Sequence, residues 1–155
     1  MINIKDLNST DDLNICTETW KTLPYDDNLS KAIVMFASDS RLHCVFIIDP
    51  YDRLFGVITR HDLLHWIRNK LVTISFHSLS DADQCIRLRN LTNSTKVREV
   101  MNRNGLTASI YPNDTLLHAL NLMTEFELTV LPIIDESNRI IGARTLSEIL
   151  SPIIS

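Results

Sequence analysis

Residues 56–62 read Gly-Val-Ile-Thr-Arg-His-Asp, and residues 142–148 repeat the phrase as Gly-Ala-Arg-Thr-Leu-Ser-Glu. Other landmarks recur at almost the same distance, and the offset falls only from 88 to 86 positions along the chain. Two one-residue gaps account for that drift, so the register indicates a tandem duplication. The matching landmarks are Pro24 with Pro112, Leu29 with Leu116, Ala32 with Ala119, Asp49 with Asp135, and Thr59 with Thr145.

Each half carries the same succession of patterns. An extended stretch ends at a Pro-containing turn, and apolar residues at i, i+3, i+4 and i+7 then predict a helix. Two β-rich runs separated by a polar turn follow, and a final helix closes the unit. The predicted elements are extended stretches 19–22 and 107–110, helices 29–36 and 116–123, strands 44–48, 54–58, 130–134 and 140–144, and final helices from Asp62 and Ser147.

The predicted unit is therefore β-α-β-β-α, which assigns the chain to the α+β (α/β) class. Neither unit of roughly 50 residues could bury its sheet alone, so we expect the two repeats to pack sheet to sheet. We divide the chain into a first repeat (1–66), a connector (67–94) and a second repeat (95–155). The connector should extend the first repeat's last helix and continue as a polar spacer.

Composition limits the classes of protein that the chain can represent. Its 155 residues carry a formal net charge of −4 and are 45% hydrophobic, which disfavours disorder and a general nucleic-acid binder. No run of about 18 apolar residues predicts a membrane span, and the N-terminus shows no secretory signal pattern. Cys16, Cys44 and Cys85 are odd in number and widely spaced. This pattern disfavours a disulfide framework or a zinc site and favours a reducing, cytoplasmic location.

The repeated phrase places a hydroxyl at the end of a strand and a carboxylate in the first turn of the helix that follows. Free N–H groups at such a helix start suit a phosphate, and a carboxylate can accept bonds from ribose hydroxyls. Gly56 permits close backbone approach. The plain alternative is helix capping, because Thr59 and Asp62 also have the spacing of a capping box.

The two repeats resemble cystathionine-β-synthase (CBS) domains arranged as the tandem pair called a Bateman module. The Gly-hydrophobic-x-Thr/Ser-x-x-Asp/Asn signature of that family is complete in residues 56–62, whereas Glu148 replaces its last residue in the second repeat. Residues 97–101 and 131–135 match further phrases of the family. The resemblance implies pseudo-two-fold symmetry between the repeats and ligand clefts at their junction.

In the first cleft, the resemblance implies that ribose and phosphate face one group of side chains and the base rests against another. The first group is Val57, Thr59, His61 and Asp62, and the second is Thr107, Ala108, Leu128 and Thr129.

The second cleft should be the weaker one, because Glu148 is a methylene longer than Asp and could crowd a ribose. Its implied residues are Thr19, Leu42, His43, Arg144, Thr145 and Glu148. Val130 occupies the place where family members that bind several phosphates often carry a basic residue.

The implied function is regulatory sensing of an adenosine-containing ligand (AMP, ADP, ATP or S-adenosylmethionine) as effector, with no required cofactor. Ligand binding would change the arrangement of a homodimer or of a larger effector protein. The alternative is a ligand-free dimerisation or docking domain of a larger transporter, channel or enzyme, which Glu148 and Val130 favour. We expect no nucleic-acid partner and no direct membrane insertion.

No nucleophile elbow, P-loop, Rossmann fingerprint or Cys-x-x-Cys motif occurs, so we predict that the chain is not an enzyme. An alternative with His61 as a general base beside Asp62 would require turnover of a nucleotide. His61 and His65 have the i, i+4 spacing of a helical metal pair. Because no third ligand lies nearby in sequence, we predict no metal site.

Overall fold

The first repeat contains a three-stranded sheet with helices on one side. The structure, a computed structural model, describes residues 19–75, 80–103 and 107–154, so residues 1–18 of the predicted first unit, including Cys16, lie outside it. The elements of this repeat are β1 (Trp20–Pro24), α1 (Leu29–Ser38), β2 (Cys44–Ile48), β3 (Leu54–Thr59) and α2 (Arg60–Ser75). The expected strands and helices of this half are confirmed, although α2 begins two residues before the predicted Asp62.

Strand β2 lies at the centre of this sheet. It pairs in parallel with β1 and antiparallel with β3, with Cys44 opposite Trp20 on one side and Thr59 on the other. All of β2 except its last residue is buried, as expected for an apolar run covered on both faces. This register puts the end of β3, and with it the start of α2, beside the start of β2.

The second repeat contains α5 (Leu116–Phe126), β4 (Val130–Ile134), β5 (Ile140–Thr145) and α6 (Leu146–Ile154). Strands β4 and β5 pair antiparallel in the register of β2 and β3, with Val130 opposite Thr145. The expected extended stretch 107–110 is not a strand. Only Ile110 pairs, through an isolated parallel bridge to Ile133, because the chain reaches the sheet edge there and turns away at Tyr111 and Pro112.

The two sheets pack against each other, as the sequence predicted. Phe46, Val57 and Leu54 of the first sheet share a buried cluster with Val130, Ile134 and Ala143 of the second. The hairpin turns meet symmetrically as well, because Leu54 N donates to Asn138 O and Ile140 N donates to Asp52 O. Each of these donor–acceptor pairs becomes the other when 86 is added or subtracted, which is a direct mark of pseudo-two-fold symmetry.

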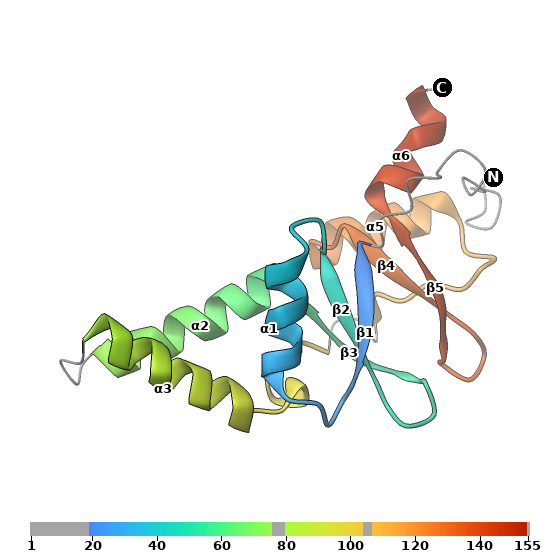
Figure 1. The fold of residues 1–155 in the computed structure, drawn as a ribbon. Coiled ribbons are helices and arrows are strands. Elements are labelled where there is room, and N and C mark those ends of the chain that lie inside the picture. The colour runs from blue at the N-terminus through green and yellow to red at the C-terminus, as the bar shows by residue number, and fades with distance from the viewer. Residues whose placement is uncertain (1–18, 76–79, 104–106, 155) are drawn as a thin grey trace.

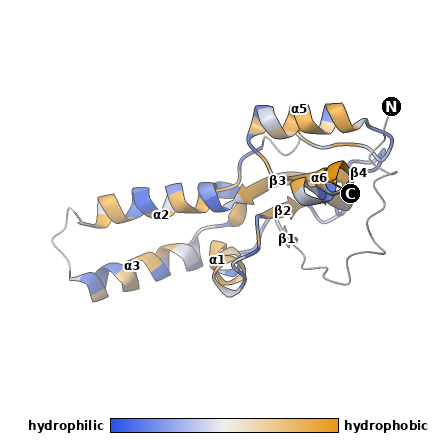
Figure 2. Ribbon diagram, turned by 90° about the horizontal axis from the view of Figure 1, so that it is seen from above, coloured by the Kyte–Doolittle hydropathy of each residue, from blue (hydrophilic) through white to orange (hydrophobic). Residues whose placement is uncertain are grey.

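Helices cover the outer faces of the paired sheets, with α1 and α5 on opposite sides (Figure 2). The first repeat's own core joins α1 and the start of α2 to the sheet, and includes Leu29, Phe36, Ile58 and Leu63. The second core joins α5 and α6 to β4. The order of layers is therefore helix, sheet, sheet, helix.

The connector forms a helical arm. Helix α2 continues to Ser75, and α3 (Asp81–Ser94) runs back beside it, so the two helices project from the sheets as a hairpin (Figure 1). The polar stretch that the sequence marks as a spacer is therefore helical over Asp81–Ser94. A short turn of helix, η2 (Val97–Glu99), returns the chain to the first repeat, where Val97 N donates to Asp27 O.

Candidate functional site

A cavity of about 350 Å³ opens between the two repeats. It is bounded by the start of β2, by the junction of β3 with α2, and by the segment that joins α5 to β4. Its lining residues are Ser40, Leu42, His43, Cys44, Thr59, Arg60, His61, Glu127, Leu128, Thr129 and Val130. The volume is in the range of small-molecule sites.

The cavity lies where the repeats contact each other across the pseudo-two-fold axis. His43 Nδ1 lies 2.7 Å from Thr129 Oγ1, and these two residues occupy equivalent positions of the two repeats. Leu42 and Leu128 are likewise equivalent, and both are buried. The cavity therefore has an apolar wall from each repeat and a polar contact between them.

The Thr59–Asp62 turn starts α2 at the edge of this cavity. Asp62 Oδ2 accepts hydrogen bonds from Thr59 N at 2.9 Å and Thr59 Oγ1 at 3.0 Å, and Thr59 Oγ1 accepts from Asp62 N at 3.2 Å. These contacts form the capping arrangement that was the plain alternative. The remaining lone pair of Thr59 Oγ1 can still accept a bond from a ligand hydroxyl.

Asp62 does not line the cavity. Its Oδ2 also accepts from Asn102 Nδ2 at 2.6 Å, so the carboxylate ties the start of α2 to the segment that follows η2. His61 instead contacts His65, with 3.0 Å between their Nε2 atoms. The two neighbours therefore have different partners, His65 for His61 and Asn102 for Asp62.

Arg60 lines the cavity, but its guanidinium serves the backbone. Its Nε donates to Leu42 O at 2.7 Å and its Nη2 donates to Asp39 O at 2.6 Å, and the group lies over the Phe36 ring. These bonds fix the loop between α1 and β2, which carries Leu42 and His43. Nothing in the sequence distinguished this role from that of a solvated arginine.

The predicted first-cleft residues are only partly brought together. Thr59, His61, Leu128 and Thr129 line one cavity. Val57 is buried in the cluster between the sheets, and Ala108 is buried in the core of the second repeat.

Thr107 is exposed and is not among the lining residues. Asn102 contacts the Thr59–Asp62 turn but was not predicted, because it lies 40 positions away and in no recognisable motif.

The predicted second-cleft residues divide into two groups. Leu42 and His43 line the cavity already described, and Thr19 O accepts from His43 N at 2.7 Å. Arg144, Thr145 and Glu148 lie at the junction of β5 and α6, where Glu148 accepts from Thr145 Oγ1 at 3.2 Å and pairs with Arg144 at 3.5 Å. The longer Glu148 side chain thus reproduces the Thr59–Asp62 contact.

Cys44 forms part of the cavity wall as an unreactive group. Burial raises the pKa of its thiol to about 12, so it stays protonated at neutral pH and behaves as a small apolar side chain. Among residues 19–75, 80–103 and 107–154, no group of three or more His, Cys, Asp or Glu side chains could hold a metal ion.

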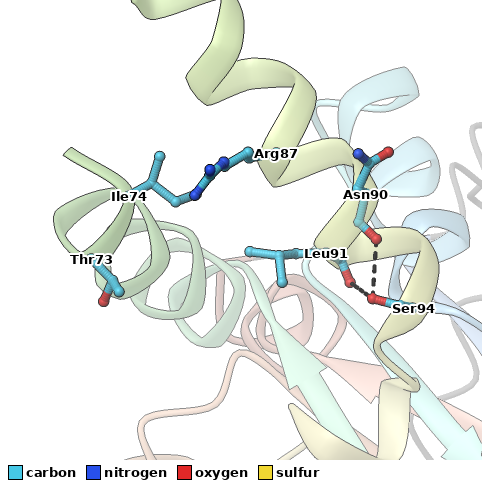
Figure 3. Close-up of a pocket in the computed structure, with 6 residues that line it drawn as sticks. All are labelled: Thr73, Ile74, Arg87, Asn90, Leu91 and Ser94. Atoms are coloured by element: carbon cyan, nitrogen blue, oxygen red, sulfur yellow. Dashed lines mark hydrogen bonds between the residues drawn. The ribbon is translucent and has the colours of Figure 1, made fainter. Parts of the chain in front are cut away.

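A second cavity, of about 300 Å³, lies within the α2–α3 arm (Figure 3). Ile74 and Leu91 line it together with Thr73, Arg87, Asn90 and Ser94. Ser94 Oγ donates to the carbonyls of Asn90 and Leu91, so this hydroxyl is hydrogen-bonded within its own helix. None of the predicted ligand residues lies here.

The fold and the cavity define a class: a β-α-β-β-α repeat and an α-β-β-α repeat, joined sheet to sheet with a ligand-sized space at their junction. A model of the CBS-domain family matches residues 4–69 and 97–154. The chain therefore belongs to the CBS-domain family, and its two matched segments make it a tandem pair.

Similar proteins include a curated relative and solved structures. The homoserine O-acetyltransferase of Methanosphaera stadtmanae is 24% identical over 136 residues, which are 88% of this chain and 22% of that protein. The chain thus spans about a fifth of the length of that relative. The crystal structure of CBSX2 in complex with AMP has a TM-score of 0.67 at 16% identity and covers 99% of this chain and 97% of that one.

The cytosolic domain of the Mg²⁺ channel MgtE in complex with ATP has a TM-score of 0.59 at 18% identity. That similarity covers 86% of this chain and 45% of that one. At these identities the two structures establish the shared fold. Within the described part of the chain, no helix combines the length and apolar character needed to cross a membrane.

Proposed function

We propose that this CBS pair is a regulatory module that binds an adenosine-containing ligand between its repeats. The observation that supports the proposal is the 350 Å³ cavity, which has Thr59 and His61 on one side and Leu128 and Thr129 on the other. The base would lie against Leu42 and Leu128. The ribose and phosphate would lie toward Thr59 and the start of α2, where free N–H groups favour an anion.

AMP is the first ligand to test. CBSX2, a structural neighbour, is a complex with AMP, and the cavity of this chain has one cationic side chain, Arg60, among its lining residues. The Arg60 guanidinium is engaged by backbone carbonyls, which leaves the helix start as the main attraction for phosphate. That supply of positive charge suits one phosphate better than three.

The proposal predicts a calorimetric titration that distinguishes two matched variants. Thr59→Ala and Thr145→Ala each remove a hydroxyl that accepts from the first turn of a helix, so both should lose similar stability, about 1 kcal/mol. Thr59 lines the cavity and Thr145 does not. We expect AMP to bind the wild type and Thr145→Ala alike, and Thr59→Ala at least several-fold more weakly.

The titration should include ADP, ATP and S-adenosylmethionine under the same conditions. Absence of binding heat for all four ligands with the wild type would rule out the sensing role. Equal weakening by the two threonine variants would show that the loss comes from helix stability and not from a ligand contact.

The second candidate function is docking or homodimerisation without a ligand, and the α2–α3 arm favours it. Leu64 is 63% exposed on α2 and Ile86 is 52% exposed on α3, which places large apolar side chains on helices that project from the sheets. Sedimentation of the wild type and of Leu64→Lys would test it, because a dimer formed through the arm should dissociate in the variant.

We further propose that the module acts in a reducing compartment such as the cytoplasm, without catalysis of its own. Cys44 and Cys85 are free thiols, as expected where disulfides do not persist. Asp62 and His61 are engaged with different partners, which removes the acid–base pair considered for an enzyme. Incubation with adenine nucleotides followed by chromatography should show no product.

A further inference from the structure

Two histidines face each other at the start of α2. The Nε2 atoms of His61 and His65 lie 3.0 Å apart, with ring centroids 4.4 Å apart and the ring planes at 74°. Both residues are exposed. Because a hydrogen bond at this distance has one donor and one acceptor, at least one of the facing nitrogens offers a lone pair toward the other.

The separation of these nitrogens fits a shared metal ion. Metal–imidazole bonds of about 2.0–2.1 Å, meeting at about 90–110°, place two ligand nitrogens roughly 2.9–3.4 Å apart. The observed 3.0 Å lies within that range. The distance between the two nitrogens therefore permits one metal ion to contact both of them.

We propose that His61 and His65 bind one divalent transition-metal ion, such as Zn²⁺, through their Nε2 atoms, at the rim of the cavity between the repeats. Imidazole nitrogens suit Zn²⁺, Ni²⁺ and Cu²⁺, whereas Mg²⁺ and Ca²⁺ prefer oxygen ligands. The sequence argued against a metal site because no third ligand lies nearby. The structure adds the facing nitrogens and the adjoining cavity.

The backbone that carries the two histidines is held in place. Leu63, Trp66 and Ile67, on the opposite side of α2, pack in or against the core of the first repeat. Residues four apart on such a helix stay neighbours, so the pair is preorganised. The equivalent positions of the second repeat hold Ser147 and Ser151, so this is a feature of the first repeat alone.

The site is open on its remaining sides. Within the described part of the chain, no third His, Cys, Asp or Glu side chain joins the pair as a ligand. Water or an oxygen of a bound molecule would complete the coordination. His61 lines the cavity, so a phosphate of the bound nucleotide is the natural oxygen donor; this last step rests on the proposed function, whereas binding of the metal ion does not.

The test is a titration of the full chain with Zn²⁺ in a non-chelating buffer. Cys16→Ser and Cys85→Ser should be present in every sample so that these thiols do not compete, and the buried Cys44 can stay. We expect one Zn²⁺ per chain, with the ring ¹⁵N signals of His61 and His65 shifting and those of His43 and His118 unchanged. His61→Ala and His65→Ala should each weaken binding at least tenfold.

His118→Ala is the matched control, because His118 is an exposed histidine on α5 with no histidine four residues away. It should bind Zn²⁺ like the parent protein. Equal affinity of the parent, His61→Ala and His65→Ala would overturn the proposal, as would shifts confined to other histidines.

A titration with AMP, with and without Zn²⁺, separates the two proposals. His65 does not line the cavity, so Zn²⁺ should tighten AMP binding in the parent protein and not in His65→Ala. Binding of Zn²⁺ without any binding of AMP would refute the nucleotide proposal and leave the metal site standing. Binding of both with no effect of one on the other would refute coordination of the phosphate.

Discussion

Residues of the repeated phrase can cap a helix and can border the cavity, and the sequence alone does not show which copy has which role. The Thr59–Asp62 turn caps α2 and also borders the cavity, whereas its counterpart, Thr145 with Glu148, caps α6 away from that cavity. The motif was recognisable because it is local. Which copy of the motif borders the cavity could not be predicted, because that depends on Asn102 and on the opposite repeat.

Gly56 illustrates how a motif residue can serve the fold and not the ligand. A Cβ at Gly56 would lie 2.5 Å from Met101 Sδ and 3.0 Å from Asn102 O, whereas a Cβ at Gly142 would meet nothing closer than Ile133 Cδ1 at 4.0 Å. The close approach expected at Gly56 is thus to the segment after η2, which bridges to Val57.

We therefore predict that Gly56→Ala lowers the free energy of unfolding by about 1–3 kcal/mol, as overpacking does. Gly142→Ala, the matched control, should change it by less than about 1 kcal/mol. Urea unfolding followed by circular dichroism measures both. Equal losses in the two variants would contradict the role assigned to Gly56.

Among the secondary-structure elements, the hairpins β2–β3 and β4–β5 are held by the same set of hydrogen bonds to an aspartate in the turn. Asp49 accepts from the backbone N–H groups of Tyr51 and Arg53 and from Arg53 Nε, and Asp135 accepts in the same way from Ser137 and Arg139. The strands were predicted within a residue from apolar runs. The carboxylate ties were not, since they depend on how each turn folds back.

These ties change the acidity of both carboxyl groups. Burial acts to raise the pKa of Asp49, but the hydrogen bonds from Arg53 and Tyr51 outweigh it and leave the pKa lowered. The backbone hydrogen bond from Arg139 is the main cause of the lowered pKa of Asp135. A lowered pKa in the folded state means that folding favours the carboxylate.

We predict that Asp49→Asn and Asp135→Asn are less stable than the wild type at neutral pH, and that the difference shrinks as the pH falls. The contribution of each carboxylate is complete above the unfolded pKa of about 3.9 and is lost as the pH falls through the lower folded value. Thermal unfolding from pH 7 to pH 2.5 measures this effect. Asp26→Asn, at an exposed turn, controls for loss of charge. A difference that grew on acidification would show that the ionised carboxylates do not stabilise the fold.

At the scale of the whole molecule, the repeats depend on each other. Phe46 and Val130 belong to one buried cluster although they come from different repeats. Without the other repeat, this face of either sheet would be exposed to water. Periodicity and duplication made the sheet-to-sheet packing predictable. The length and direction of the α2–α3 arm were not, because its polar sequence contains few core positions.

We predict that a substitution that destabilises one repeat also destabilises the other. Ile149 is fully buried in the second core, so Ile149→Ala should cost about 2–5 kcal/mol. Trp66 packs against the first core, whereas Trp20 packs against the cluster shared by both repeats, so Trp66 fluorescence, measured in a Trp20→Phe background, reports on the first repeat.

The fluorescence and far-ultraviolet circular dichroism transitions of Ile149→Ala should shift together, as one cooperative unit requires. A fluorescence transition that stayed at its wild-type midpoint while the dichroism shifted would show that the repeats unfold independently.

If both repeats contact one ligand in the cavity between them, as we propose, nuclear Overhauser effects should connect AMP with leucine methyl groups of both repeats. Leu42 and Leu128 occupy equivalent positions and both line that cavity, whereas Leu91 lines the cavity of the α2–α3 arm. We predict effects from the adenine protons to Leu42 and to Leu128 in the same complex. Effects to Leu91 alone, or to only one of the equivalent leucines, would show that the two repeats do not share the ligand.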